Sequence, residues 1–194
     1  MSSHDSDTRS RILKAAWKLL EEGSSAVRVS DIAKETGISR QALYLHFPNR
    51  AELLIATTRY VDEVNDVNSL LEPSREATDG KVRLIAFVGA WAAYIPKIHG
   101  VASALIAMQD NDEAARKAWA DRMAAIRHGC AAAVDALMDD AQLQKHLGRE
   151  EAIDVLSMLL TVENWQHLRH NCGWSQSQYL NLMKQMAMQS LVSK

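Results

Sequence analysis

Residues 29–54, VSDIAKETGISRQALYLHFPNRAELL, decide how this 194-residue chain is organised. Apolar residues recur at helical spacing on both sides of Gly37. Glycine adopts the left-handed conformation that a tight turn requires and that other residues avoid. The pattern therefore predicts two short helices, over about residues 30–36 and 40–46, joined by a tight turn.

The apolar residues of these two predicted helices are expected to face the core. Ile32, Ala33 and Ile38 would pack the helices together. Leu43 and Phe47 would pack the second helix against a preceding helix, predicted over about residues 7–22 with Asp7 as its cap and Gly23 at its end. Such a pair is a helix-turn-helix, whose second helix enters the major groove of DNA.

The outward face of the second helix would then carry the DNA contacts. In the major groove arginine reads guanine and glutamine reads adenine, while tyrosine contacts a thymine methyl or a phosphate. Phosphates are also bound by the amides and hydroxyls at helix starts and by cations. These rules select seven candidate residues: Ser30, Ser39, Arg40, Gln41, Tyr44, His46 and Arg50.

The charge of the chain is divided unevenly. The total is −2, which by itself gives no reason to expect a nucleic-acid partner. Residues 1–50, however, hold eight Lys and Arg against six Asp and Glu, a net of +2, and the remainder holds 14 against 18, a net of −4. A weakly basic N-terminal part fits a polyanion site, although a difference of this size also arises by ordinary fluctuation.

Residues 37–54, GISRQALYLHFPNRAELL, closely resemble the DNA-binding signature of TetR-family transcriptional regulators. That signature reads glycine, an aliphatic residue, serine, variable residues, Leu-Tyr, any residue, His or Tyr, Phe, a break, a cation and Leu-Leu. The resemblance covers about residues 8–55, with Ser30 near a position where threonine is common and Arg50 where lysine is commoner. It implies a sequence-specific regulator, a repressor released from a palindromic operator by a small-molecule effector.

The rest of the chain is also predicted to be helical, so the expected fold class is all-α. Residues 1–6 are expected to be a flexible tail. The expected domains are a helix-turn-helix domain over residues 1–54 and a helical ligand-binding and dimerisation domain over residues 55–194. Further helices are predicted over about residues 50–71, 81–95, 101–109, 112–138, 150–170 and 175–192, with a polar loop over residues 72–80.

The family resemblance implies a homodimer formed through the last two helices. Those helices carry more apolar residues than one inward stripe requires: Met158, Leu159, Leu160, Val162, Leu182, Met186 and Met188. An effector pocket would draw on aromatic and methionine side chains, which at helical spacing also serve as ordinary core. The candidates are Trp91, Tyr94, Met108, Trp119, Met123 and Trp165.

Two other classes of function remain as alternatives. Glu163, His167 and His170 would share one helical face with Cys172 close by, which suggests a metal-dependent helical-bundle enzyme. Di-iron proteins need two Glu-x-x-His repeats and further inward glutamates, and this chain has no such repeat. We therefore expect no enzyme activity, no metal and no cofactor. An architectural DNA binder without an effector is the other alternative.

The sequence also indicates where the protein works. Its two cysteines are too few for a disulfide framework, which favours the cytoplasm. The longest apolar run, residues 84–96, is shorter than the roughly 20 residues that span a bilayer, so no membrane partner is expected.

Overall fold

The computed structural model describes residues 3–23 and 27–193. Over these residues it is helical, with one isolated antiparallel bridge between Leu143 and Val192. The all-α prediction is therefore confirmed. The chain forms two compact units: Met1–Asn65 with Ile98–Met123, and Asp66–Lys97 with Ala124–Lys194.

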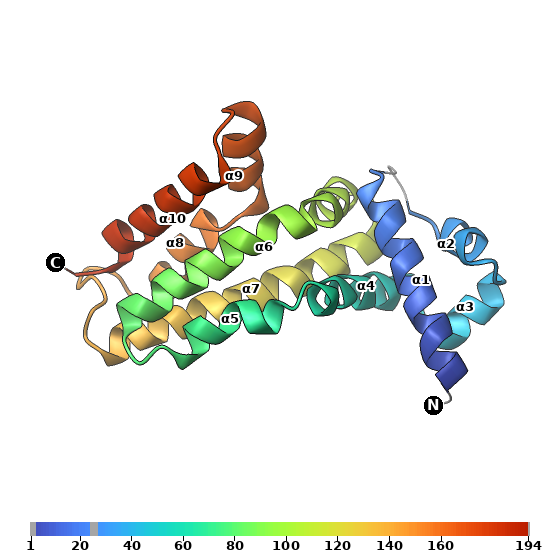
Figure 1. Cartoon of the computed structure of the whole chain (residues 1–194), viewed down its shortest axis with the longest axis horizontal. Coiled ribbons are helices and arrows are strands. Elements are labelled where there is room, and N and C mark those ends of the chain that lie inside the picture. The colour runs from blue at the N-terminus through green and yellow to red at the C-terminus, as the bar shows by residue number, and fades with distance from the viewer. Residues whose placement is uncertain (1–2, 24–26, 194) are drawn as a thin grey trace. The chain divides into compact units, whose positions relative to one another are not determined.

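The first unit is built around its N-terminal helix, which packs against both the second and the fourth helices (Figure 1). Its interior is filled by fully buried aliphatic side chains, among them Ile12, Leu20 and Leu53. The elements are α1 (Ser3–Glu21), α2 (Val29–Thr36), α3 (Arg40–His46) and α4 (Arg50–Val64), joined by residues 98–108 of α6 (Gly80–Met108) and 113–123 of α7 (Glu113–Asp139).

Two boundaries in this unit differ from the prediction. The helix α1 already begins at Ser3, so the expected tail over residues 1–6 is wrong for its described part, and Asp7 lies inside the helix instead of capping it. The helix α4 ends at Val64 and does not reach residue 71. The Asn65 side chain donates a hydrogen bond to the Val61 carbonyl (2.9 Å), and Asp66 with φ 49° starts a new helix. Polar side chains that bond locally to the backbone end helices.

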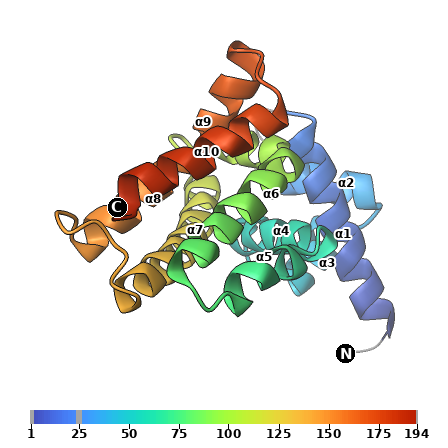
Figure 2. The same cartoon turned by 60° about the vertical axis from the view of Figure 1, so that its left-hand side comes forward.

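The second unit contains α5 (Val67–Glu76), residues 80–97 of α6, residues 124–139 of α7, α8 (Arg149–Leu159), α9 (Val162–Gln166), a π-helical turn η1 (His167–Asn171) and α10 (Gln176–Leu191). The helices α8 and α10 pack against each other (Figure 2). The indole of Trp91 donates to the Leu160 carbonyl (2.6 Å), and the Gln176 amide donates to the Ala92 carbonyl (2.6 Å). These bonds fix α6 against the C-terminal helices.

In this part of the chain, helices were predicted to end at prolines and polar runs that the structure places inside helices. The predicted loop over residues 72–80 is helical to Glu76, because α5 continues through Pro73 and buries Ser74, whose hydroxyl donates to the Arg83 carbonyl (3.1 Å). The predicted helices over residues 81–95 and 101–109 form one helix that contains Pro96. A proline removes one backbone hydrogen bond, and extensive burial along α6 offsets that loss at Pro96.

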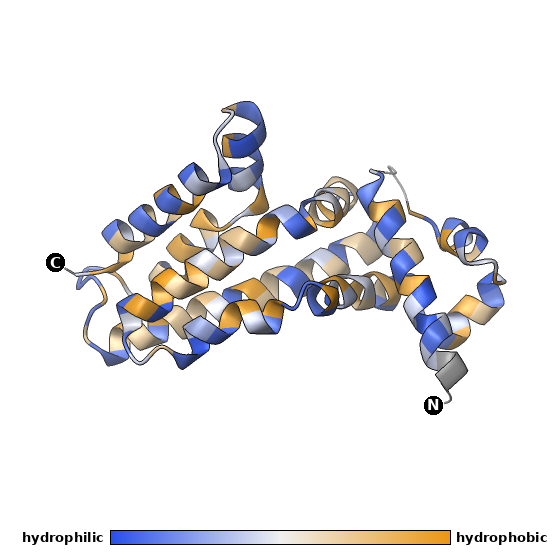
Figure 3. Cartoon of the chain, viewed as in Figure 1, coloured by the Kyte–Doolittle hydropathy of each residue, from blue (hydrophilic) through white to orange (hydrophobic). Residues whose placement is uncertain are grey.

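By length and composition, the helix α6 could cross a membrane. Its apolar character is visible as a mostly orange ribbon in Figure 3. The apolar run over residues 84–96 underestimated the length of this helix, because the helix continues through Pro96. However, 56% of the apolar window is buried inside the protein, which is typical of a core helix.

The predicted helix over residues 150–170 is also interrupted. The helix α8 ends at Leu159, the Thr161 hydroxyl caps α9, and residues 167–171 wind as a π-helical turn. The single face that was expected to carry Glu163, His167 and His170 therefore does not exist as a regular α-helical face.

Candidate nucleic-acid interface

The turn between α2 and α3 has the predicted geometry. Gly37 ends α2 with φ 68° and ψ 26°, and the Ile38 amide donates to the Ala33 carbonyl (3.0 Å). A methyl group added at Gly37 would meet no atom within 4 Å, so glycine is needed here for its backbone conformation alone. The turn directs α3 away from α2.

The helix α3 separates its buried and exposed side chains sharply. The Ser39 hydroxyl caps it by accepting a hydrogen bond from the Ala42 amide (3.0 Å). Leu43 is fully buried on the inner side. The predicted base-reading residues Arg40, Gln41 and Tyr44 are all exposed, and 40% of the Tyr44 surface is accessible. The three predicted base-reading side chains thus share one open face.

The structure places Ser30 differently from the prediction. The helix α2 begins at Val29 with Arg28 as its N-cap residue, so Ser30 lies in the first turn and does not open the helix. The Arg28 amide donates to the Asp31 carboxylate (3.2 Å), which fixes this start. The Ser30 side chain is exposed beside the first amides of α2, where a phosphate oxygen can be bound.

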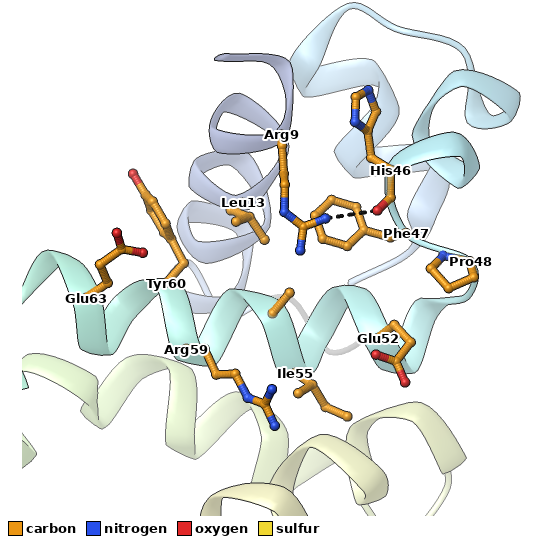
Figure 4. A pocket seen from close by; sticks show the side chains of 11 residues that line it. Arg9, Leu13, His46, Phe47, Pro48, Glu52, Ile55, Arg59, Tyr60 and Glu63 are labelled. Carbon is orange, nitrogen blue, oxygen red and sulfur yellow. Dashed lines mark hydrogen bonds between the residues drawn. The ribbon is translucent and has the colours of Figure 1, made fainter. Parts of the chain in front are cut away.

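His46 stands at the junction of α1, α3 and α4 (Figure 4). Its carbonyl accepts a hydrogen bond from the Arg9 guanidinium (2.9 Å), and the same guanidinium lies 4.2 Å from the centre of the buried Phe47 ring. A cleft of about 380 Å³ opens beside this contact, lined by residues of α1, α4 and the end of α3, including Tyr60 and Glu63. Arg9 thereby holds the C-terminal end of α3 against α1.

Arg50 is held by contacts inside the first unit. Its Nε donates to the Val27 carbonyl (2.9 Å) and its guanidinium forms an ion pair with Asp112 (2.5 Å). Only 21% of its side chain is accessible. Burial opposes ionisation of Asp112, but hydrogen bonds from Arg50 and from the Ala115 amide outweigh it, so the pKa of Asp112 lies below its usual value.

Other cationic side chains of the N-terminal region also bind protein groups and stabilise the fold. Arg11 donates to the Thr36 carbonyl at the end of α2 (2.8 Å), and Lys18 pairs with Glu35 (2.6 Å). The roles of Arg9 and Arg11 were missed in the sequence, because a backbone carbonyl far along the chain leaves no residue pattern. Lys14 and Lys34 are exposed.

The six candidates for an effector pocket are divided between the units. Met108, Trp119 and Met123 belong to the first unit, while the other three are buried in the second. Within the second unit the Trp91 and Tyr94 rings meet edge to face with centres 5.9 Å apart, and the Trp165 indole donates to the Gln176 side chain (2.9 Å).

Tyr179 is a buried residue of the second unit that sequence reasoning did not single out. Its hydroxyl has no hydrogen-bond partner among the described residues, and burial raises its pKa. It belongs to no motif in the sequence that would separate it from an ordinary core aromatic.

The residues of the metal alternative do not form a ligand set. The Cys172 sulfur lies 3.5 Å from His167 Nε2, and the His170 ring packs edge to face on Trp165. Over the described ranges, no group of three or more His, Cys, Asp or Glu side chains is placed to hold a metal ion.

Comparison with known proteins agrees with this geometry. Residues 12–57 match the family model described as "Bacterial regulatory proteins, tetR family". A nucleoid occlusion factor SlmA from Vibrio atlanticus is 31% identical over 84 residues, which are 41% of this chain and 42% of that protein. The chain thus matches less than half the length of this curated relative.

Solved structures resemble the chain over nearly its whole length. A putative transcriptional regulator from Saccharomonospora viridis in complex with choline superposes with a TM-score of 0.74 at 21% identity, over 97% of this chain and 100% of that one. A SmeT–triclosan complex superposes with a TM-score of 0.71 at 17% identity, over 97% and 93%. At these identities the likeness shows a shared fold.

Proposed function

Because this chain belongs to the TetR family of DNA-binding transcriptional regulators, we propose that it is a repressor that leaves a palindromic operator when a small-molecule effector binds. The observation that carries the proposal is the exposed face of α3. Arg40, Gln41 and Tyr44 project from a helix whose opposite side is fully buried at Leu43. A rigidly held helix with an open polar face is the geometry of a major-groove reader.

The proposed contacts follow from the position of each side chain. Arg40 and Gln41 read base edges, and Tyr44 contacts a thymine methyl or a phosphate. The hydroxyls of Ser30 and Ser39 donate to phosphates, since a hydroxyl that accepts one hydrogen bond still donates another. His46 borders the backbone of the same half-site. Arg50 acts through the fold: it ties α4 to the segment before α2.

The proposed dimer forms through α8 and α10. Met158 of α8 is 56% accessible, although large apolar residues favour burial. Met186 and Met188 of α10 are half-buried within one chain. A two-fold axis would cover these residues and present two copies of α3 at a spacing of about 34–36 Å, one turn of DNA. Light scattering is expected to give twice the chain mass of 21.6 kDa, and a single-chain mass at micromolar concentration would contradict it.

The proposed effector is a flat or apolar small molecule bound by the second unit. Trp91, Tyr94 and Trp165 supply buried aromatic surface there, and such surfaces suit flat or apolar ligands. Structural relatives in complex with choline and with triclosan support small-molecule binding by this fold. We place this regulation in the cytoplasm.

A gel shift with DNA flanking the chain's own gene tests the repressor proposal. We expect a retarded complex that weakens steeply as salt rises, because phosphate contacts release counterions. Compounds that raise the melting temperature in a thermal-shift screen are then added to the complex. Release of the DNA supports the proposal, whereas binding that no stabilising compound affects contradicts it.

Effector-independent binding is the second candidate function. It is favoured by the similarity of this chain to curated relatives that are named nucleoid occlusion factors. It predicts DNA binding that persists with every stabilising compound.

A further inference from the structure

The most exposed large apolar side chain of the described residues lies on α3. Leu45 is 87% accessible, more than Val82 at 58% or Met158 at 56%. Leu43 and Phe47 each lie two residues from Leu45 in the sequence. They are buried to 1% accessibility or less and pack α3 against the rest of the first unit. Leu45 therefore contributes almost nothing to the folding of this unit.

Single exposed leucines occur on many protein surfaces and by themselves need no explanation. The position of this one is informative. Leu45 follows Gln41 by four residues, and with about 100° per residue the two side chains are separated by only about 40° around the helix. It also adjoins Tyr44. Leu45 thus extends the same open face that carries the polar base-reading candidates.

The edges of base pairs in the major groove are almost entirely polar. Their one apolar group is the C5 methyl of thymine, which apolar side chains contact. An exposed leucine on a groove-facing surface would otherwise be placed against hydrogen-bonding groups that it cannot satisfy. We propose that Leu45 is a specificity-determining residue that recognises a thymine methyl in each operator half-site. This inference rests on the proposed DNA-binding function of α3.

The spacing within the helix locates that thymine relative to the base pair read by Gln41. Four residues of α-helix advance about 6 Å along the helix axis, and base pairs repeat about every 3.4 Å. The thymine is therefore expected one or two base pairs from an adenine that forms the bidentate contact with the Gln41 side chain. An A·T-rich stretch in each half-site follows from the two contacts together.

The test uses the full chain and thymine-to-uracil exchange, which removes only the methyl group. Operator duplexes are first selected from a random palindromic library with wild-type protein. Each thymine of the half-site is then replaced by uracil in turn, in both half-sites. At one position of the half-site, wild type is expected to lose about fourfold in affinity for each methyl group removed. This factor corresponds to the free energy of burying one methyl group. The Leu45→Ala variant is expected to bind thymine and uracil duplexes equally there.

The variant Gln41→Ala is the matched control from the same face. It is expected to bind the operator more weakly and yet keep the preference of wild type for thymine over uracil at the Leu45 position. Because Leu45 is 87% accessible, Leu45→Ala should melt at the wild-type temperature, so that changes in affinity report the contact itself.

The outcomes distinguish failure of the Leu45 assignment from failure of the DNA-binding function. If wild type selects a palindrome but no uracil exchange changes its affinity, or if Leu45→Ala keeps every wild-type preference, the assignment of Leu45 is overturned and the DNA-binding function stands. If wild type selects no DNA at all, the proposed function fails and the inference fails with it.

Discussion

Replacing Arg50 by methionine separates a structural role from a role in phosphate binding. The guanidinium joins Val27, which precedes α2, to Asp112, which precedes α7. In the sequence this residue looked like a phosphate ligand. In the structure its accessible fraction is 21% and its hydrogen bonds end on protein groups.

The expected loss of stability follows from these contacts. A hydrogen bond to a charged group contributes about 1.5–3 kcal/mol. Removal of Arg50 costs less than breaking a fully buried pair, because Asp112 keeps the Ala114 and Ala115 amides as donors. We expect Arg50→Met to lower the free energy of unfolding of the first unit by about 3 kcal/mol.

Urea denaturation followed by circular dichroism measures this change, with Arg59→Met as the matched control. Arg59 also lies on α4 and also pairs with an aspartate, Asp121, at 2.8 Å, but its side chain is 65% accessible. Exposed pairs contribute about 0–1 kcal/mol, so the control is expected to unfold close to wild type. Equal losses in Arg50→Met and Arg59→Met would refute the assignment.

The salt dependence of DNA binding gives the second half of this test. A lysine or arginine that contacts a phosphate contributes about one to the slope of log affinity against log salt. The structural role predicts that Arg50→Met keeps the wild-type slope. A slope reduced by about two, one for each protomer of the dimer, together with wild-type stability, would make Arg50 a phosphate ligand.

Three further predictions concern local packing and chemistry. Ser39→Ala removes the cap of α3 and should destabilise the first unit by about 1 kcal/mol in urea denaturation; unchanged stability would contradict the cap. A methyl group on Gly129 would lie 2.6 Å from the Phe87 ring, so Gly129→Ala should lower the melting temperature at an overpacking cost of about 1–3 kcal/mol, whereas a rise would show that the ring moves freely. Burial raises the pKa of Cys130 to about 11, so its thiol stays protonated at pH 8 and iodoacetamide should label only the exposed Cys172; a doubly labelled native protein in the mass spectrum would contradict this.

The helix-turn-helix could be predicted from sequence because its signals are local. The turn needs the left-handed conformation that Gly37 adopts. Ser39 and Asn49 cap their helices by accepting hydrogen bonds from amides three residues further along the chain. Periodicity then separates the buried Leu43 from the exposed Tyr44. Each of these features is decided within a few residues of chain.

Features decided over long distances were not predictable in this way. Arg9 and Arg11 bond to carbonyls 37 and 25 residues away, so nothing near them in the sequence marks their role. Pro96 lies inside α6 because burial along that helix outweighs the loss of a backbone hydrogen bond. Pro73 lies inside α5, which buries only Ser74, and nothing near it in the sequence marks the helix as continuing. Leu45 was not singled out in the sequence, although the helical period places it on the side opposite the buried Leu43.

If the exposed face of α3 reads DNA, one affinity ratio must differ between the wild-type protein and a variant of that face. Fluorescence anisotropy at fixed salt compares the selected palindrome with a scrambled duplex of the same composition, for wild type and for Tyr44→Ala. Tyr44 is 40% accessible, so its loss should leave the fold intact. Wild type is expected to prefer the palindrome by about a thousandfold or more, and Tyr44→Ala is expected to lose much of this preference at unchanged melting temperature. Equal binding of both duplexes by wild type, or the same ratio in the variant, would contradict it.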